Sequence, residues 1–64
     1  MAFKIYCQQW QIDRDGLKLI GKERYHSEVE TEDEAIEEVR QLTAVYRDLR
    51  KGGAYGSSAR YEKS

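Results

Sequence analysis

Hydrophobic and polar residues alternate along residues 3–29, in two runs separated by the dipeptide Asp15-Gly16. Alternation with a period of two is typical of a strand that buries one face. Asp-Gly suits the positive φ angles of a tight two-residue turn, so the two runs predict an antiparallel β-hairpin. With these two residues as the loop, Trp10 pairs with Gly21.

The first of the two runs changes parity halfway along. Its apolar residues occupy odd positions before Gln8 and even positions after Gln9. A β-bulge at Gln8-Gln9 would return both sets to one face, with Trp10 lying over Gly21, and this is the arrangement we favour. The alternative is a regular strand that holds Trp10 and Tyr6 on the exposed side. The two sets are Phe3, Ile5 and Cys7 before the break, and Trp10 and Ile12 after it.

Residue types typical of helix ends occur at Thr31 and at Gly52, and they predict a helix between these two positions. Thr31 and Glu34 have the spacing of a capping box, in which the threonine side chain accepts a hydrogen bond from the backbone of the first turn. Gly52 is a natural C-terminal stop. The pattern predicts one helix about 30 Å long. Its apolar stripe consists of Ala35, Ile36, Val39, Leu42, Val45, Tyr46 and Leu49.

Residues 53–64 are rich in glycine and serine, which is typical of a linker. The alternative is a short third strand, because Tyr55, Ala59 and Tyr61 could share such a strand. The sequence therefore predicts an α+β fold, ββα or ββαβ. Residues 1–52 form its single domain, a bulged antiparallel hairpin packed on one long α-helix, and residues 53–64 form a tail or a short strand.

The chain is small for an independent domain. It has 64 residues, 39% of them hydrophobic, and a domain of about this size buries only about 60% of its unfolded surface. A two-stranded sheet is marginal alone and leaves open edges. We therefore expect a homodimer formed by hairpin edges or helices, or else a protein partner. A single cysteine excludes an internal disulfide. With no signal-peptide segment or apolar run of about 18 residues, we expect a cytoplasmic protein with no membrane contact.

Few side chains suggest catalysis or metal binding. Cys7 falls on the predicted core face with no histidine near it in the sequence, and free cysteine is among the most buried residue types. His26, the only histidine, falls on the polar face without a second ligand. The acidic run of residues 28–38 lacks the glycine and spacing of a calcium loop, and Gly52–Gly56 lacks the Lys-Ser/Thr of a phosphate-binding loop. We expect no enzymatic activity, no metal and no cofactor.

The net charge of −1 hides a strong asymmetry along the chain. Residues 28–38 carry seven acidic side chains and no basic one, whereas residues 39–64 carry six basic and two acidic ones. The leading hypothesis is a non-catalytic interaction protein whose acidic helix start binds a basic surface of a partner protein. In size and charge it is similar to phage- or mobile-element-encoded inhibitors and small antitoxins. The predicted acidic surface consists of Glu28, Glu30, Glu32, Asp33, Glu37 and Glu38, and the aromatic anchors are Tyr6, Trp10, Tyr25 and Tyr46.

The alternative is nucleic-acid binding by the basic outer face of the hairpin. Lys18, Lys22 and Arg24 would share that face with Tyr6, and a basic sheet face with aromatic side chains can bind nucleic acid. The start of the predicted helix, with threonine at position 31, glutamate at 34 and alanine at 35, resembles the arm-type DNA-binding domain of phage integrases. Those domains place a small sheet before a capped helix with a Thr-x-x-Glu-Ala start. The resemblance covers about a third of the chain and supports only this alternative.

Overall fold

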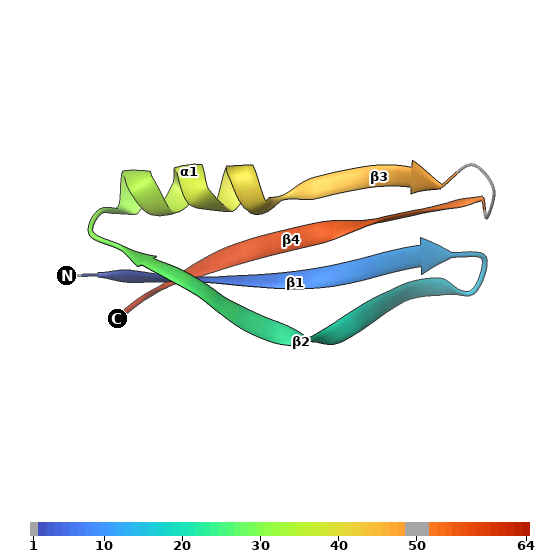
Figure 1. Cartoon of the computed structure of the whole chain (residues 1–64), viewed down its shortest axis with the longest axis horizontal. Helices are drawn as coiled ribbons and strands as arrows, with labels where there is room; N and C mark the ends of the chain where they lie inside the picture. The colour runs from blue at the N-terminus through green and yellow to red at the C-terminus, as the bar shows by residue number, and fades with distance from the viewer. Residues whose placement is uncertain (1, 49–51) are drawn as a thin grey trace.

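The computed structural model describes residues 2–48 and 52–64, which form a four-stranded antiparallel sheet and one α-helix (Figure 1). The strand order in the sheet is β2-β1-β4-β3. The predicted α+β class is confirmed, but most of the described chain is sheet and the helix is shorter than predicted. The elements are β1 Phe3–Asp13, β2 Gly16–Val29, α1 Glu32–Leu42, β3 Ala44–Asp48 and β4 Gly53–Lys63.

The predicted hairpin is formed by β1 and β2, with its turn one residue earlier than expected. Asp13 pairs with Gly16, so Arg14 and Asp15 form the loop. The Asp13 carboxylate accepts the backbone N–H of Asp15 at 2.8 Å, and Gly16 takes a φ of 113° directly after the loop. That N–H, and then the Lys18 ammonium 3.3 Å away, hold the pKa of Asp13 below its ordinary value. The aspartate side chain therefore favours this turn, and the partner of each β1 residue changes by two positions, so that Trp10 pairs with Leu19 in place of Gly21.

The predicted bulge in β1 is wrong, because the irregularities lie in β2. Pairing of β1 with β4 runs without interruption from Phe3–Lys63 to Ile12–Ala54. Against β2, the register shifts twice, and both shifts place the additional residues in β2. At the second shift, the Gln8 side-chain amide donates to the carbonyls of Ile20 and Gly21, at 3.2 and 3.0 Å. The regular-strand alternative is therefore the one that the structure adopts.

The start of α1 is as predicted, and its end is not. The Thr31 hydroxyl accepts the backbone N–H of Glu34 at 3.2 Å. The helix ends at Leu42, where the backbone N–H and hydroxyl of Thr43 both donate to the Val39 carbonyl, at 3.0 and 2.7 Å. Residues 44–48 form an edge strand in place of the predicted helix, and residues 49–51 of that helix lie outside the described residues. β-Branched and aromatic side chains in this segment favour a strand once a partner strand is present.

The partner of that edge strand is β4. The sequence predicted a tail or a short strand for this segment, and the structure has a long strand there. It has 11 residues and lies between β1 and β3 in the middle of the sheet. The backbones approach closely here, since a Cβ atom built on Gly56 would lie 2.0 Å from the Ala44 carbonyl oxygen. The Ser57 hydroxyl also donates to the Leu42 carbonyl at 2.6 Å, which ties β4 to the end of α1. The glycines and serines that resemble a linker are thus compatible with a central strand.

The two faces of the sheet are covered unequally. Because β1 is regular, its odd-numbered residues point to one face and its even-numbered residues to the other. Helix α1 lies along the end of the sheet that holds both termini (Figure 1). It covers the odd-numbered side there, because Ile5 is fully buried and Ser57 on the same side bonds to the end of the helix. We call this side the helix face and the other side the open face. Among the described residues, only Ile5 on the helix face and Ala35 in α1 are fully buried hydrophobic residues.

Candidate interaction surfaces

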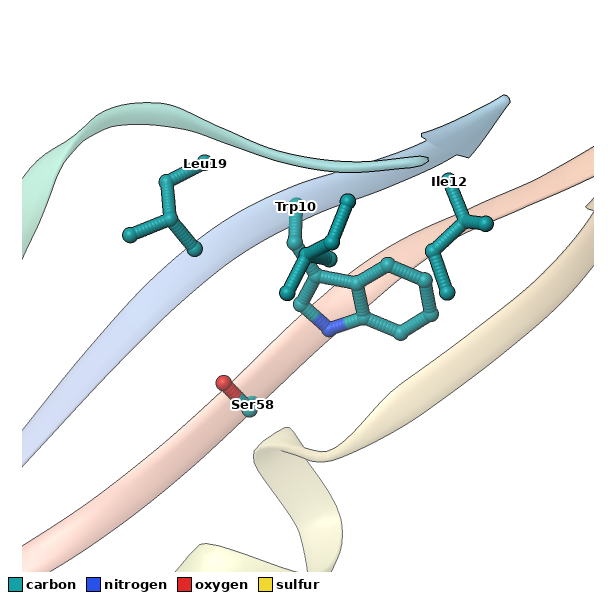
Figure 2. Close-up of a pocket in the computed structure, with 5 residues that line it drawn as sticks. Trp10, Ile12, Leu19 and Ser58 are labelled. Atoms are coloured by element: carbon teal, nitrogen blue, oxygen red, sulfur yellow. The ribbon is translucent and has the colours of Figure 1, made fainter. Parts of the chain in front are cut away.

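An apolar patch lies on the open face at the hairpin end of the sheet. Trp10 lies at its centre, half-buried, and we call the group the Trp10 patch. A shallow hollow of about 260 Å³ is lined by part of the group together with Ser58 (Figure 2). Exposed fractions within the patch reach 66% for Leu19 and 64% for Val45. Helix α1, the one helix of the described residues, does not cover this surface. The Trp10 patch consists of Trp10, Ile12, Leu17, Leu19 and Val45.

Trp10 lies over Gly56 of β4 and not over Gly21 as predicted. Trp10 and Gly56 are paired across β1 and β4, and a Cβ atom on the glycine would lie 3.0 Å from the Trp10 ring. In Figure 2 the indole lies flat across the strands on the side of Ile12 and Leu19. The indole is therefore supported by backbone below it, while its other surface faces outward. A large aromatic side chain held in this way is a typical binding anchor.

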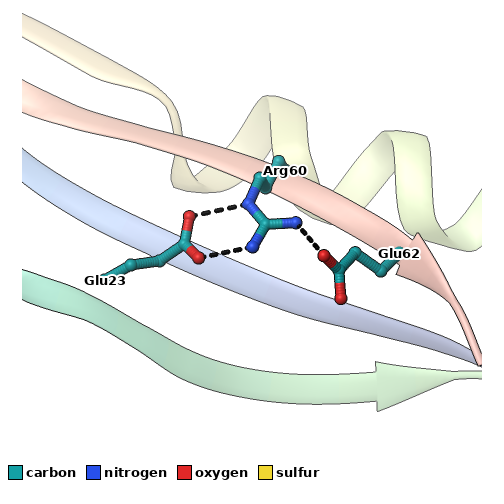
Figure 3. Close-up of polar contacts among 3 residues, drawn as sticks. All are labelled: Glu23, Arg60 and Glu62. Carbon is teal, nitrogen blue, oxygen red and sulfur yellow. Dashed lines mark hydrogen bonds and ion pairs between the residues drawn. The ribbon is translucent and has the colours of Figure 1, made fainter.

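The other half of the open face is polar and is organised around Arg60 of β4. Its guanidinium donates to both carboxylate oxygens of Glu23, at 2.7 and 2.5 Å, and to Glu62 at 2.6 Å (Figure 3). The same guanidinium lies over the Tyr6 ring, 4.8 Å from its centroid, and Tyr6 contacts Tyr25 edge to face at 5.9 Å. Arg60 thus connects β4 to β2 across β1.

We expect this arrangement to make stability depend on pH. The hydrogen bonds from Arg60 hold the pKa of Glu23 below its ordinary value, although partial desolvation acts in the opposite direction. The folded chain therefore resists protonation of Glu23, and this stabilisation is complete above the unfolded pKa of about 4.3 and is lost as pH falls through the lowered folded value. The melting temperature of the wild-type chain should fall between about pH 5 and pH 3, as followed by circular dichroism.

Two substitutions separate the Glu23 contribution from general acid destabilisation. Glu23→Gln should lower the melting temperature at pH 6 and should give a shallower decline on acidification. Glu30→Gln removes the same charge from an exposed residue that has no ion pair among the described residues, so its curve should run parallel to the wild type. Parallel curves for all three proteins would contradict a stabilising Arg60–Glu23 pair.

The predicted acidic surface lies at the end of the molecule where β2 leads into α1. Five of its six side chains are exposed and Glu38 is half-buried. Glu37 lies 3.8 Å from Arg40 in the next turn of the helix, and Gln41 donates to Glu37 at 3.4 Å. The other five have no ion pair within the described residues. They are Glu28, Glu30, Glu32, Asp33 and Glu38.

The predicted aromatic anchors do not form one surface. Trp10, Tyr6 and Tyr25 point to the open face. Tyr46 points to the helix face, where its ring stacks on that of Tyr55 at 5.4 Å. The open face therefore carries three of the four anchors, with Trp10 at the hairpin end and the tyrosines beside Arg60.

The predicted basic surface forms on a different face from the one expected. Register and pocket geometry place Lys18, Lys22 and Arg24 on the helix face, beyond the part that α1 covers. Tyr6, which was expected to join them, points to the opposite face. Lys18 is already paired with Asp13. The combination of lysines and tyrosine that motivated nucleic-acid binding is therefore divided between two faces.

The two residues considered for catalysis, Cys7 and His26, have different surroundings. Cys7 is half-buried and, with Lys22 and Arg24, lines a hollow of about 250 Å³ on the helix face. His26 is exposed, and its Nδ1 is 2.9 Å from the Ser27 hydroxyl. Across residues 2–48 and 52–64, no three acidic, cysteine or histidine side chains are grouped as metal ligands. No helix in the same residues is long and apolar enough to cross a membrane.

Two features of the open face were missed from the sequence. The Arg60 contacts join residues far apart in the chain, and only the alternation of Arg60, Tyr61 and Glu62 hinted that this segment is a strand. Val45 was assigned to the apolar stripe of the predicted helix, so nothing in the sequence indicated that it lies on the same face of a sheet as Trp10. Comparison of the chain with protein-family models, with curated proteins and with solved structures found no match in any of the three.

Proposed function

We propose that this chain is a small, non-catalytic protein–protein interaction module whose acidic end binds a basic surface of a partner protein. The observation that carries the proposal is a contrast between two groups of carboxylates. Asp13, Glu23 and Glu62 in the sheet are each paired with a cation of the same chain. The exposed carboxylates at the start of α1, such as Glu32 and Asp33, have no such cation among the described residues.

Unpaired charges at one end of an elongated molecule suit recognition by charge. The molecule measures 44 × 19 × 13 Å, and α1 occupies the end that also holds the termini (Figure 1). Complementary charge speeds diffusional encounter and rejects partners of like charge. A partner whose basic surface normally holds nucleic acid would fit this end, and the module would then act as its inhibitor. Self-association is compatible with this role, because the Trp10 patch lies towards the other end.

A protein partner is favoured over nucleic acid by the placement of the charges. The unpaired acidic residues would repel phosphates, while Lys18 is neutralised by Asp13 and the remaining hairpin bases lie on a different face from Tyr6. Binding to nucleic acid depends steeply on salt, since it releases counterions. Submicromolar binding of labelled DNA or RNA at low salt, lost on replacing Lys22 and Arg24, would overturn the proposal.

The test of the acidic end compares two variants that each remove two negative charges. Proteins retained by the immobilised chain are purified, and the dissociation constant of each is measured by calorimetry. Glu32→Gln/Asp33→Asn should weaken binding about tenfold, or about 1.4 kcal/mol, and should flatten its dependence on salt. The control, Asp13→Asn/Asp15→Asn, removes two charges from the hairpin turn at the opposite end of the molecule and keeps a side-chain oxygen that can accept the backbone N–H of residue 15, so it should bind as the wild type does.

Equal affinity of the two variants for every retained partner would reject the acidic end as the binding surface. Because acidic side chains in the first turn also stabilise a helix, both variants are first compared with the wild type by circular dichroism at the temperature of the binding experiment. A loss of helix in Glu32→Gln/Asp33→Asn alone would call for Glu37→Gln/Glu38→Gln, which lie beyond the first turn.

A further inference from the structure

The chain exposes more surface than a compact protein of its mass. Its accessible surface is 5120 Å², whereas a folded monomer of 7.5 kDa exposes about 4,200 Å². Its radius of gyration is 13.6 Å, compared with about 11 Å for a compact domain of this length. The excess area is therefore about 900 Å², close to the roughly 800 Å² that each partner contributes to a standard protein interface.

Much of the exposed apolar surface is the Trp10 patch. Leu17, Leu19 and Val45 are 64%, 66% and 64% exposed, and Ile12 is 42% exposed. These residues come from β1, β2 and β3 and lie on one face, next to the small residues Gly56 and Ser58 of β4. Contiguous apolar surface of this kind is uncommon on monomers and marks an interface.

The edges of the sheet are poorly suited to pairing with another strand. Along β2, two register shifts disrupt the edge, and charged residues follow one another at Lys22, Glu23 and Arg24. At the other edge β3 is only five residues long. Bulges, charge and short length are the devices that keep sheet edges from pairing. The edge-to-edge dimer expected from the hairpin is therefore not the arrangement that this sheet favours.

We infer that the Trp10 patch is covered by the same patch of a second copy of the chain, forming a two-fold dimer in which two sheets pack face to face. Sheets packed in this way lie about 10 Å apart, with side chains of the two inner faces interdigitating. In a two-fold interface the same residues lie on both sides, so Trp10 of one copy contacts the leucines of the other. The uncovered indole surface seen in Figure 2 is then buried.

Charge favours a second copy as the occupant. The residues of the patch are uncharged, so the patch is complementary to itself, with Arg47 of β3 at its rim on the same face. Each chain carries a net charge of only −1. The Arg60 cluster lies further along the open face (Figure 3), and the acidic start of α1 lies at the far end of the molecule (Figure 1). If the two copies overlap only at the hairpin ends of their sheets, the acidic ends of both copies stay uncovered and point away from each other. This inference does not depend on the proposed partner of those ends.

Two adjacent residues of β2 give a matched test. Leu19 points to the open face and Ile20 to the helix face, and both are substantially exposed in the single chain. Sedimentation equilibrium of the full chain at tens of micromolar should give twice the monomer mass of 7.5 kDa. Leu19→Glu should raise the dissociation constant at least a hundredfold and give the monomer mass, whereas Ile20→Glu should remain a dimer.

A second measurement uses the unmodified chain, in case Leu19→Glu fails to fold alone. Isotope-labelled and unlabelled chains are mixed, and isotope-filtered nuclear Overhauser spectra report contacts between copies. Contacts from the Trp10 ring of one copy to methyl groups of Leu17 or Leu19 of the other are expected. A wild-type monomer at 100 μM, dissociation by Ile20→Glu in place of Leu19→Glu, or intermolecular contacts confined to β3 or the helix would each overturn the inference.

Discussion

Replacing Ile5 by alanine should remove about 2–5 kcal/mol from the free energy of unfolding. Ile5 is the largest fully buried side chain of the described residues and lies in the half of the sheet that α1 covers. A chain of 64 residues has roughly 3–10 kcal/mol of stability in total. The substitution should therefore leave the protein partly unfolded at 37 °C, which urea titration followed by circular dichroism will measure.

The control for this substitution is Ile20→Ala. Ile20 is also an isoleucine on the helix face, but it lies beyond α1 and is 46% exposed. Replacing Ile20 by alanine should lower the free energy of unfolding by about 1 kcal/mol or less. Both variants are titrated at one protein concentration, because self-association makes stability depend on concentration. Similar losses for the two isoleucines would show that α1 does not form a core with the sheet at Ile5.

Alanine in place of Gly56 should destabilise the chain by about 1–3 kcal/mol although it adds only a methyl group. The new Cβ atom would lie 2.0 Å from the Ala44 carbonyl oxygen and 3.0 Å from the Trp10 ring. The closer atom belongs to the backbone, so β3 has to move away from β4. Because Tyr46 and Tyr55 stack across the same two strands, thermal unfolding and near-ultraviolet circular dichroism of the tyrosines should both change.

Two comparisons show whether the backbone contact is the cause. Ser58→Ala is on the same face of β4 and adds no atom, so its stability should stay within about 0.5 kcal/mol of the wild type. Combining Gly56→Ala with Trp10→Leu removes the side-chain contact but leaves the clash with the carbonyl, and the double variant should not recover stability. A Gly56→Ala protein as stable as the wild type would mean that β3 and β4 are further apart than described.

Local signals predicted the hairpin and the start of the helix. The alternation along residues 3–29 gave both strands of the hairpin, and the Thr31 capping box gave the first turn of α1. These features depend on neighbours in sequence. The parity break at Gln8-Gln9 was recognised but was interpreted as a bulge in β1. The uninterrupted ladder of β1 with β4 shows that β1 is regular, so its apolar residues before the break lie on the helix face and those after it lie on the open face.

The rest depends on pairing between distant segments. Val45 and Tyr46 fit a helical stripe as well as a strand, and the strand is formed because β4 is available beside them. In turn, β4 resembled a linker because its glycines and serines carry little side chain, whereas Gly56 is needed where backbones approach closely. Of the candidate surfaces, the acidic one could be predicted because its residues are consecutive in sequence. The Trp10 patch could not, because it combines three strands.

The position of β4 beside β1 also determines when the sheet can be completed during synthesis. All of β2, α1 and β3 lies between these two central strands in the sequence. Until β4 leaves the ribosome, the nascent hairpin has β1 as an unpaired edge, and Ile5 lacks one of its two flanking strands. Sheets dominated by such distant pairings fold slowly and are prone to aggregate in the interval. The sheet is therefore expected to be completed only once β4 is available to pair with β1 and β3.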